Sequence, residues 1–348
     1  MIRWLGYPCR RALRSKFLWS AAILLLLLAA AACAWCRFAP AEEPSGEYKS
    51  VYGILEYESP EELAAQIASA EEALRLEQQD LEEAIAKNLY SDAQIASTEQ
   101  NIRQMQTMLR AMRVLYEEKI SYASAVQYGD FDRENGASVA VLLFLPVSAV
   151  LGGICAARIA LKIPSERKDG QAKLTFLLPV GKVRYAAGLA FAEFAGFALL
   201  TVAFALFLLP SLYLFLGTGS AYVLVATSRT AFLLTVPAAV FLSLGFALFY
   251  LFCCAAIGFI ASLLLKSPVA SLLITLAVWL SGYLVFLGGT MVGSRPIFLQ
   301  WLLSCAVRPE FAFFSQSGAV WISVLVALAY LIPLGILALV RFHAEDIR

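Results

Sequence analysis

Few side chains in this sequence have the types and spacing that catalysis requires. The only histidine is His343, in the polar C-terminal tail, so we expect neither zinc chemistry nor histidine-based catalysis. The patterns HExxH and GxSxG are absent, and so is GxxxxGK[ST], the loop that cradles nucleotide phosphates. We therefore predict no catalytic, cofactor-binding or metal-binding residues. If the protein uses ATP and Mg²⁺, a separate subunit must bind them.

Two ionisable residues, Arg158 and Glu193, lie within long apolar runs. Arg158 is one helical turn from Lys162, which favours an arginine that extends toward the membrane surface. Glu193 follows the start of its run by about eight residues, or about 12 Å of helix. A carboxylate at that depth is costly and faces a bundle interior or an aqueous cavity. It can pair with Arg158. Glu193 is therefore either a functional residue of a conduit or dimer interface, or a structural residue in the form of a buried ion pair or a protonated acid.

The cysteines do not form a disulfide framework, because most of the seven lie in apolar runs and none lies in the large polar segment. Cys33 and Cys36 have the spacing of a redox pair. They end an apolar run and have no βαβ context, so we interpret them as small apolar residues.

The composition is that of a membrane protein. Hydrophobic residues make up 60% of the chain, the mean hydropathy is +0.73, and charged residues make up 15%, against about 25% in soluble domains. Nothing in the charge distribution indicates nucleic-acid binding.

Six apolar runs have about the length that spans a lipid bilayer. They cover residues 17–37, 137–161, 185–216, 230–265, 269–287 and 319–340. The first imitates a cleaved signal peptide, but it continues to Trp35, which favours a retained helix. An apolar stretch at 297–307 is too short to cross and predicts a re-entrant or interfacial helix.

Residues 38–136 form the only large polar segment, with twenty acidic and eight basic residues. Ser59, Pro60 and Glu62 predict a helix start, and Ser91 with Gln94 predicts a second capping box. Apolar residues recur every three or four positions on both sides of the break, as in a coiled coil. We predict an antiparallel helical hairpin, with one continuous helix as the alternative. Residues 48–57 suggest a short strand.

The basic segments set the topology by the positive-inside rule. Residues 1–16 carry five basic residues and no acid, and the loop 162–184 is also basic. Both are cytoplasmic if the N-terminus is inside, which makes 38–136 extracytoplasmic and the C-terminus cytoplasmic. The predicted fold is an all-α polytopic membrane protein with six transmembrane helices and an extracytoplasmic helical hairpin inserted between the first two. Residues 137–348 hold the other five spans.

The loop 162–184 contains an apolar stretch, LTFLLPV, that is unusual for a solvated connection. An apolar ridge flanked by charges fits docking onto a partner protein. Leu174, Leu177 and Leu178 belong to the apolar ridge, and the charges around it include Glu166, Arg167, Lys182 and Arg184. The loop also contains Gly170 and Pro179.

With six spans and this loop, the chain resembles the ABC-2 type permeases, the membrane subunits of bacterial ATP-binding-cassette exporters. Residues 13–16 and 297–307 also resemble segments of that family. The resemblance implies that the loop couples to an ABC ATPase subunit, that a second permease completes a homo- or heterodimer, and that the protein lies in the bacterial plasma membrane.

Two other functions remain open. The first is an envelope sensor or scaffold whose hairpin binds a partner, and the second is an ion-coupled transporter that uses Glu193. The substrate cannot be deduced from these residues.

Overall fold

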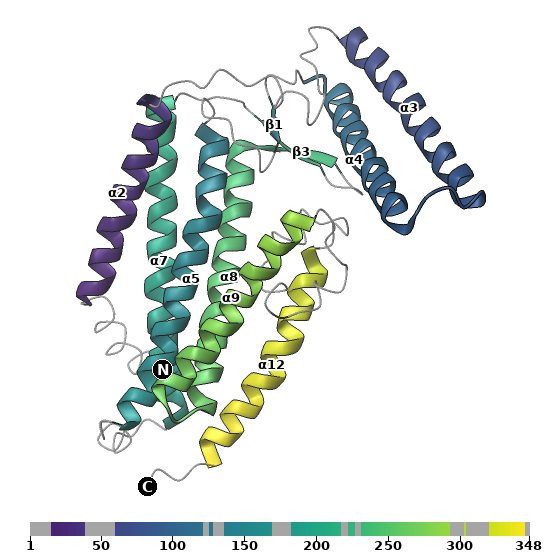
Figure 1. Cartoon of the computed structure of the whole chain (residues 1–348). Coiled ribbons are helices and arrows are strands. Elements are labelled where there is room, and N and C mark those ends of the chain that lie inside the picture. The colour runs from purple at the N-terminus through teal and green to yellow at the C-terminus, as the bar shows by residue number, and fades with distance from the viewer. Residues whose placement is uncertain are drawn as a thin grey trace.

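The computed structural model describes residues 15–38, 60–120, 125–127, 136–168, 182–216, 222–226, 231–292, 303 and 320–344. These residues are mostly helical. Six helices lie together in a bundle (Figure 1). They are α2 (Lys16–Phe38), α5 (Gly136–Lys168), α7 (Lys182–Leu216), α8 (Val236–Leu264), α9 (Pro268–Val292) and α12 (Val320–Ala344).

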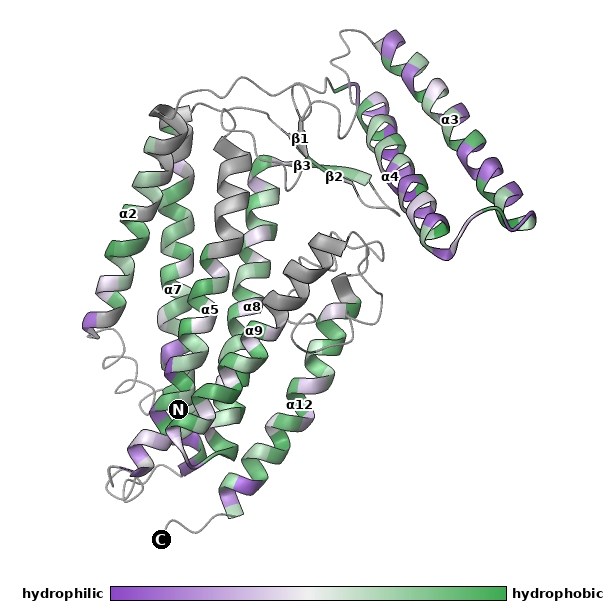
Figure 2. Ribbon diagram, viewed as in Figure 1, coloured by the Kyte–Doolittle hydropathy of each residue, from purple (hydrophilic) through white to green (hydrophobic). Residues whose placement is uncertain are grey.

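In the part of the chain that the structure describes, four helical stretches are long and apolar enough to cross a membrane. They are Val147–Glu166, Lys182–Leu208, Val236–Leu264 and Ile322–Ala344. α2 and α9 contribute shorter apolar stretches, Leu18–Ala31 and Pro268–Ser281. The bundle helices are hydrophobic over most of their length (Figure 2), and the coarse prediction of a helical membrane protein agrees with this.

Helix α5 occupies the middle of the bundle and packs against α7, α8 and α9. Small residues allow the close approach. A Cβ atom added at Gly258 of α8 would lie 2.4 Å from the carbonyl oxygen of Ala156 on α5. A Cβ atom at Gly153 would lie 2.7 Å from the Trp279 ring of α9. Helices in membranes use small residues in this way to maximise van der Waals contact.

Helices α3 (Pro60–Ala86) and α4 (Asp92–Glu117) lie outside the bundle, side by side and running in opposite directions (Figure 1). The predicted capping box at the start of α4 is confirmed. The Ser91 backbone N–H donates to Gln94 Oε1 at 3.0 Å, and the Gln94 backbone N–H donates to Ser91 Oγ at 3.4 Å. Arg113 Nη2 lies 2.6 Å from Glu71 Oε1 and joins the two helices.

A small sheet, absent from the sequence prediction, lies between α4 and the bundle. Its strands are β1 (Ala125–Gln127), β2 (Tyr222–Ala226) and β3 (Ala231–Thr235), in that order across the sheet. β1 pairs with β2 in parallel, and β2 pairs with β3 in an antiparallel register. The protein is therefore not purely helical. The sequence prediction places residues 231–235 in the fourth apolar run, but they form β3.

The two faces of this sheet pack against different parts of the protein. Leu224 is fully buried with Leu63, Met112 and Leu115 of α3 and α4. Val223 and Val225 belong instead to the core of the bundle. Side chains alternate between faces along a strand, so one short strand contacts both units.

The predicted loop 162–184 is shorter than expected at both ends. α5 continues as helix to Lys168, and α7 already begins at Lys182. Lysine, arginine and glutamate are good helix formers, so a charged stretch can extend a helix beyond its apolar part. Residues 169–181 lie outside the described residues, as do the predicted strand at 48–57 and all of 297–307 except Leu303.

Candidate functional site

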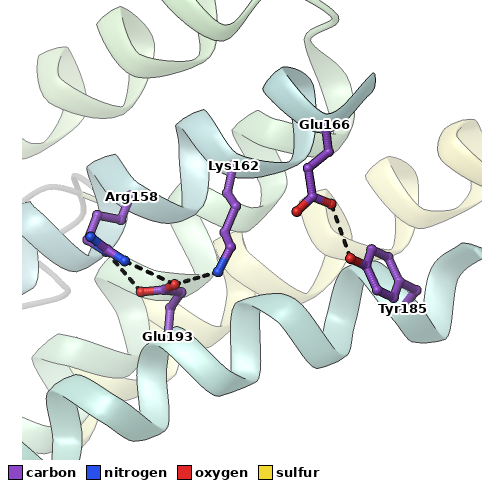
Figure 3. Close-up of polar contacts among 5 residues, drawn as sticks. All are labelled: Arg158, Lys162, Glu166, Tyr185 and Glu193. Atoms are coloured by element: carbon purple, nitrogen blue, oxygen red, sulfur yellow. Dashed lines mark hydrogen bonds and ion pairs between the residues drawn. The ribbon is translucent and has the colours of Figure 1, made fainter. Parts of the chain in front are cut away.

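Five polar side chains lie along the contact between α5 and α7 (Figure 3). Arg158, Lys162 and Glu166 come from α5 at intervals of four residues, which places them on one face of the helix. Tyr185 and Glu193 come from α7 and are eight residues apart, again on one face. We call this set the α5–α7 polar cluster.

Glu193 is the centre of the cluster. Its carboxylate is 1% exposed and has two cationic partners. Arg158 Nε donates to Oε2 at 2.9 Å, and Arg158 Nη2 donates to Oε1 at 3.3 Å. Lys162 Nζ donates to Oε1 at 2.6 Å. The carboxylate thus receives three charge-assisted hydrogen bonds, which are the strong kind.

Both cationic side chains are more exposed to solvent than the Glu193 carboxylate that they bind. The side chains of Arg158 and Lys162 are 28% and 21% exposed. A buried carboxylate is tolerated only when its desolvation is offset by close opposite charges and hydrogen bonds. Two cations around Glu193 provide this, so the arrangement joins α5 firmly to α7.

A second contact joins the same helices nearer their ends. Tyr185 Oη donates to Glu166 Oε2 at 3.3 Å. Glu166 lies two residues before the end of α5, and Tyr185 lies three residues after the start of α7. The polar cluster therefore begins where the chain leaves α5 and continues about 12 Å along the helices toward Glu193, at 1.5 Å per residue over eight residues.

The predicted pairing of Arg158 with Glu193 is confirmed. The guanidinium of Arg158 binds Glu193, and the interpretation that Arg158 extends toward the membrane surface stays a prediction. Lys162 and Glu166, both assigned to a loop, lie on helix α5. The four-residue spacing from Arg158 through Lys162 to Glu166 was a signal that could have identified this face.

Other predicted positions lie away from the cluster or outside the described residues. Lys182 Nζ lies 5.9 Å from the centre of the Phe342 ring on α12. Arg184 is exposed on the first turn of α7, and Arg167 lies in the last turn of α5. The remaining coupling-loop residues, Gly170, Leu174, Leu177, Leu178 and Pro179, lie outside the described residues.

Neither metal nor thiol chemistry is evident in the cluster. Within the ranges that the structure describes, no three His, Cys, Asp or Glu side chains come together as a metal site. Cys155, Cys253 and Cys254 are buried in the apolar clusters of α5 and α8 and form no disulfide bond. The cluster fixes the positions of two long helices relative to each other, beside the connection between them. Its role is therefore mechanical.

No protein-family model matches the chain, and a search of curated proteins found no significant match. The geometry of the α5–α7 pair is therefore the main basis for a functional interpretation.

Proposed function

We propose that this chain is the permease subunit of an ABC-2 type exporter. It moves a substrate across the bacterial plasma membrane while a separate ABC ATPase subunit binds and hydrolyses ATP with Mg²⁺. A second permease completes the transporter. The connection 169–181 between α5 and α7 is the element that receives force from the ATPase.

The α5–α7 polar cluster is the observation that carries this proposal. Helices α5 and α7 contain 33 and 35 residues, or about 50 Å each at 1.5 Å per residue. This exceeds the hydrocarbon core of a bilayer, which is about 30 Å thick. Contacts from Tyr185 to Glu193 tie the two helices together beside the connection. A push on the connection then moves both helices as one body.

The proposed topology has six spans, α2, α5, α7, α8, α9 and α12. The ends of α5, α8 and α12 lie at one end of the bundle together with the starts of α7 and α9 (Figure 1). Basic residues at that end, among them Lys168, Lys182, Lys266 and Arg341, support its assignment to the cytoplasm. The α3–α4 hairpin then lies outside the cell.

In the proposed transport mechanism, the connection 169–181 is rigidly coupled to the helix bundle. ATP binding closes the two ATPase subunits and displaces the connection 169–181 of each permease. Because α5 packs against α7, α8 and α9, its displacement shifts the bundle between inward-facing and outward-facing arrangements. Movements of packed helices as rigid bodies are a common form of such transitions.

Capture of the ATPase tests the proposal directly. The intact protein, purified from its native membranes after cross-linking, is expected to bring down a chain with Walker motifs. Leu178→Asp, in the connection, is expected to abolish this capture. Leu89→Asp is the matched control, because Leu89 is 66% exposed in the turn between α3 and α4. Failure to recover an ATPase with the wild type, or capture undiminished by Leu178→Asp, contradicts the proposal.

An envelope sensor is the second candidate, and the docking of α3 and α4 on the sheet favours it. β3 runs directly into α8, with Thr235 as the residue before the helix, so a ligand on α3–α4 would act on the bundle. If the protein is a sensor, a change in the connection 169–181 is expected to leave ligand binding to α3 and α4 intact. Measurement of both properties in Leu178→Asp therefore separates the two functions.

A further inference from the structure

A cleft of about 450 Å³ lies between the C-terminal end of α4 and the sheet. Its described lining residues are Val114, Glu117, Glu118, Ile120, Tyr222, Ala231, Phe232, Leu233 and Thr235. The volume falls within the range of about 300–1,000 Å³ that is usual for small-molecule sites. It shares no residue with the α5–α7 polar cluster, because α4, the residues that follow it, β2 and β3 line the cleft.

The floor of the cleft is one face of the sheet. Tyr222 is paired with Thr235, and Leu224 with Leu233, so all four positions share the face that α4 covers. Leu115 and Met112 of α4 cover Leu224. Tyr222 and Thr235 also line the cleft, so this face supplies an aromatic ring to its floor.

Two carboxylates border the cleft. Glu117 and Glu118 come from the C-terminal end of α4, whose last turn contains no basic residue. The C-terminus of a helix carries a partial negative charge, so acidic side chains there are not compensated by the helix itself. No lysine or arginine is among the described residues that line the cleft. The described lining therefore carries two acidic residues and no basic one, which favours a cationic ligand over an anionic one.

We propose that this cleft binds a small organic cation with a compact apolar body, such as an aryl or alkyl ammonium. The apolar body fits against Val114, Ile120 and Leu233, and the cationic head lies between the carboxylates and the Tyr222 ring. Aromatic rings attract organic cations through the negative charge of their faces. A metal ion fits poorly, because a hard cation takes six or more oxygen ligands and the lining provides two carboxylates.

The occupancy of this cleft is independent of the export proposal. The described lining comes from α4, the residues that follow it, and the strands β2 and β3, so the bound cation would contact α4 and the sheet that packs on the bundle core. The site thus has its own ligand chemistry and its own test.

Binding of benzyltrimethylammonium to the full-length protein in lipid nanodiscs tests the proposal by calorimetry. Its fixed charge limits partition into lipid, and benzyl alcohol serves as the neutral comparison. We expect saturable binding of one cation per chain and no comparable binding of the alcohol. The double variant E117Q/E118Q is expected to weaken the affinity at least tenfold. The variant A231L, which adds bulk to the floor, is expected to do the same.

The matched control is D80N/E82Q, which removes two exposed acids from α3 at a distance from the cleft. Circular dichroism verifies that the helices of each variant are intact. Equal weakening by D80N/E82Q would mean that only the general acidity of the hairpin matters, and would overturn the proposal. Absence of saturable binding, equal binding of benzyl alcohol, or full binding by E117Q/E118Q or A231L would also overturn it.

Discussion

Lys162 Nζ of α5 lies 2.6 Å from Glu193 Oε1 of α7, and this contact joins the two helices on either side of the connection 169–181. Together with Arg158 it surrounds a fully buried carboxylate with positive charge. The ionic part of the contact between α5 and α7 therefore depends on one acidic side chain.

Glu193→Gln is expected to destabilise the bundle, because it leaves two cations facing a neutral amide. Breaking a buried ion pair by removing one partner costs about 3–5 kcal/mol. We expect the lower end of this range, since Arg158 and Lys162 are partly exposed and can rehydrate. Thermal unfolding in detergent measures the loss. The control, Arg184→Gln, removes an exposed charge from the same helix, and an equal effect of both variants would contradict the central role of Glu193.

Tyr185→Phe provides a graded comparison. It removes the hydrogen bond to Glu166 without changing the charge of the cluster. A typical hydrogen bond contributes about 0.5–1.5 kcal/mol, so its effect on unfolding is expected to be smaller than that of Glu193→Gln. A larger loss of stability in Tyr185→Phe than in Glu193→Gln would show that the contact near the helix ends contributes more to stability than the ion pairs of Glu193.

Gly258→Val is expected to disrupt the contact of α8 with α5. A Cβ atom at this position would lie 2.4 Å from the Ala156 carbonyl oxygen, and backbone cannot move aside as a flexible side chain can. Overpacking costs about 1–3 kcal/mol. Gly245, on the same helix, has nothing within 4 Å of an added Cβ atom. Gly245→Val is the matched control, and similar melting temperatures for the two variants would contradict the prediction.

The capping box predicts a local effect on α4. Ser91→Ala removes the side-chain acceptor for the Gln94 amide and is expected to cost about 1 kcal/mol. Hydrogen exchange at residues 92–95 should become faster. Ser97→Ala, an exposed mid-helix substitution, should leave exchange unchanged or slow it, because alanine is the best helix former.

The pair Glu72 and Arg75 on α3 gives a dependence on pH. A hydrogen bond from Arg75, 2.9 Å in length, and its charge lower the pKa of Glu72 below its ordinary value. The stabilisation is therefore present above the pKa of the unfolded chain and is lost as the pH falls through the lowered pKa. An NMR titration of Glu72 should show its pKa rising in Arg75→Gln. If the pKa of Glu72 stayed the same in Arg75→Gln, the result would contradict the contact between the two side chains.

The sequence predicted part of this structure for clear physical reasons. Helix α4 has a capping box whose residue types and spacing are specific, and it begins as predicted. Arg158 and Glu193 were expected to pair because isolated charges in apolar runs need partners, and they do.

The strands were missed because short apolar runs look alike whether they form strands or the ends of buried helices. Residues 231–235 run into the fourth apolar segment without a polar break. Pro237 was the available signal, since proline is favoured in the first turn of a helix, and α8 indeed begins at Val236. Lys162 was missed because a charged residue after an apolar run was assigned to a loop.

The two-faced sheet has a geometric consequence. Leu224 is held by α3 and α4, its neighbours Val223 and Val225 by the bundle, and β3 leads into α8 within one residue. Because β2 and β3 pack on both units, we expect a tilt of α8 to shift the sheet and, with it, the α3–α4 pair.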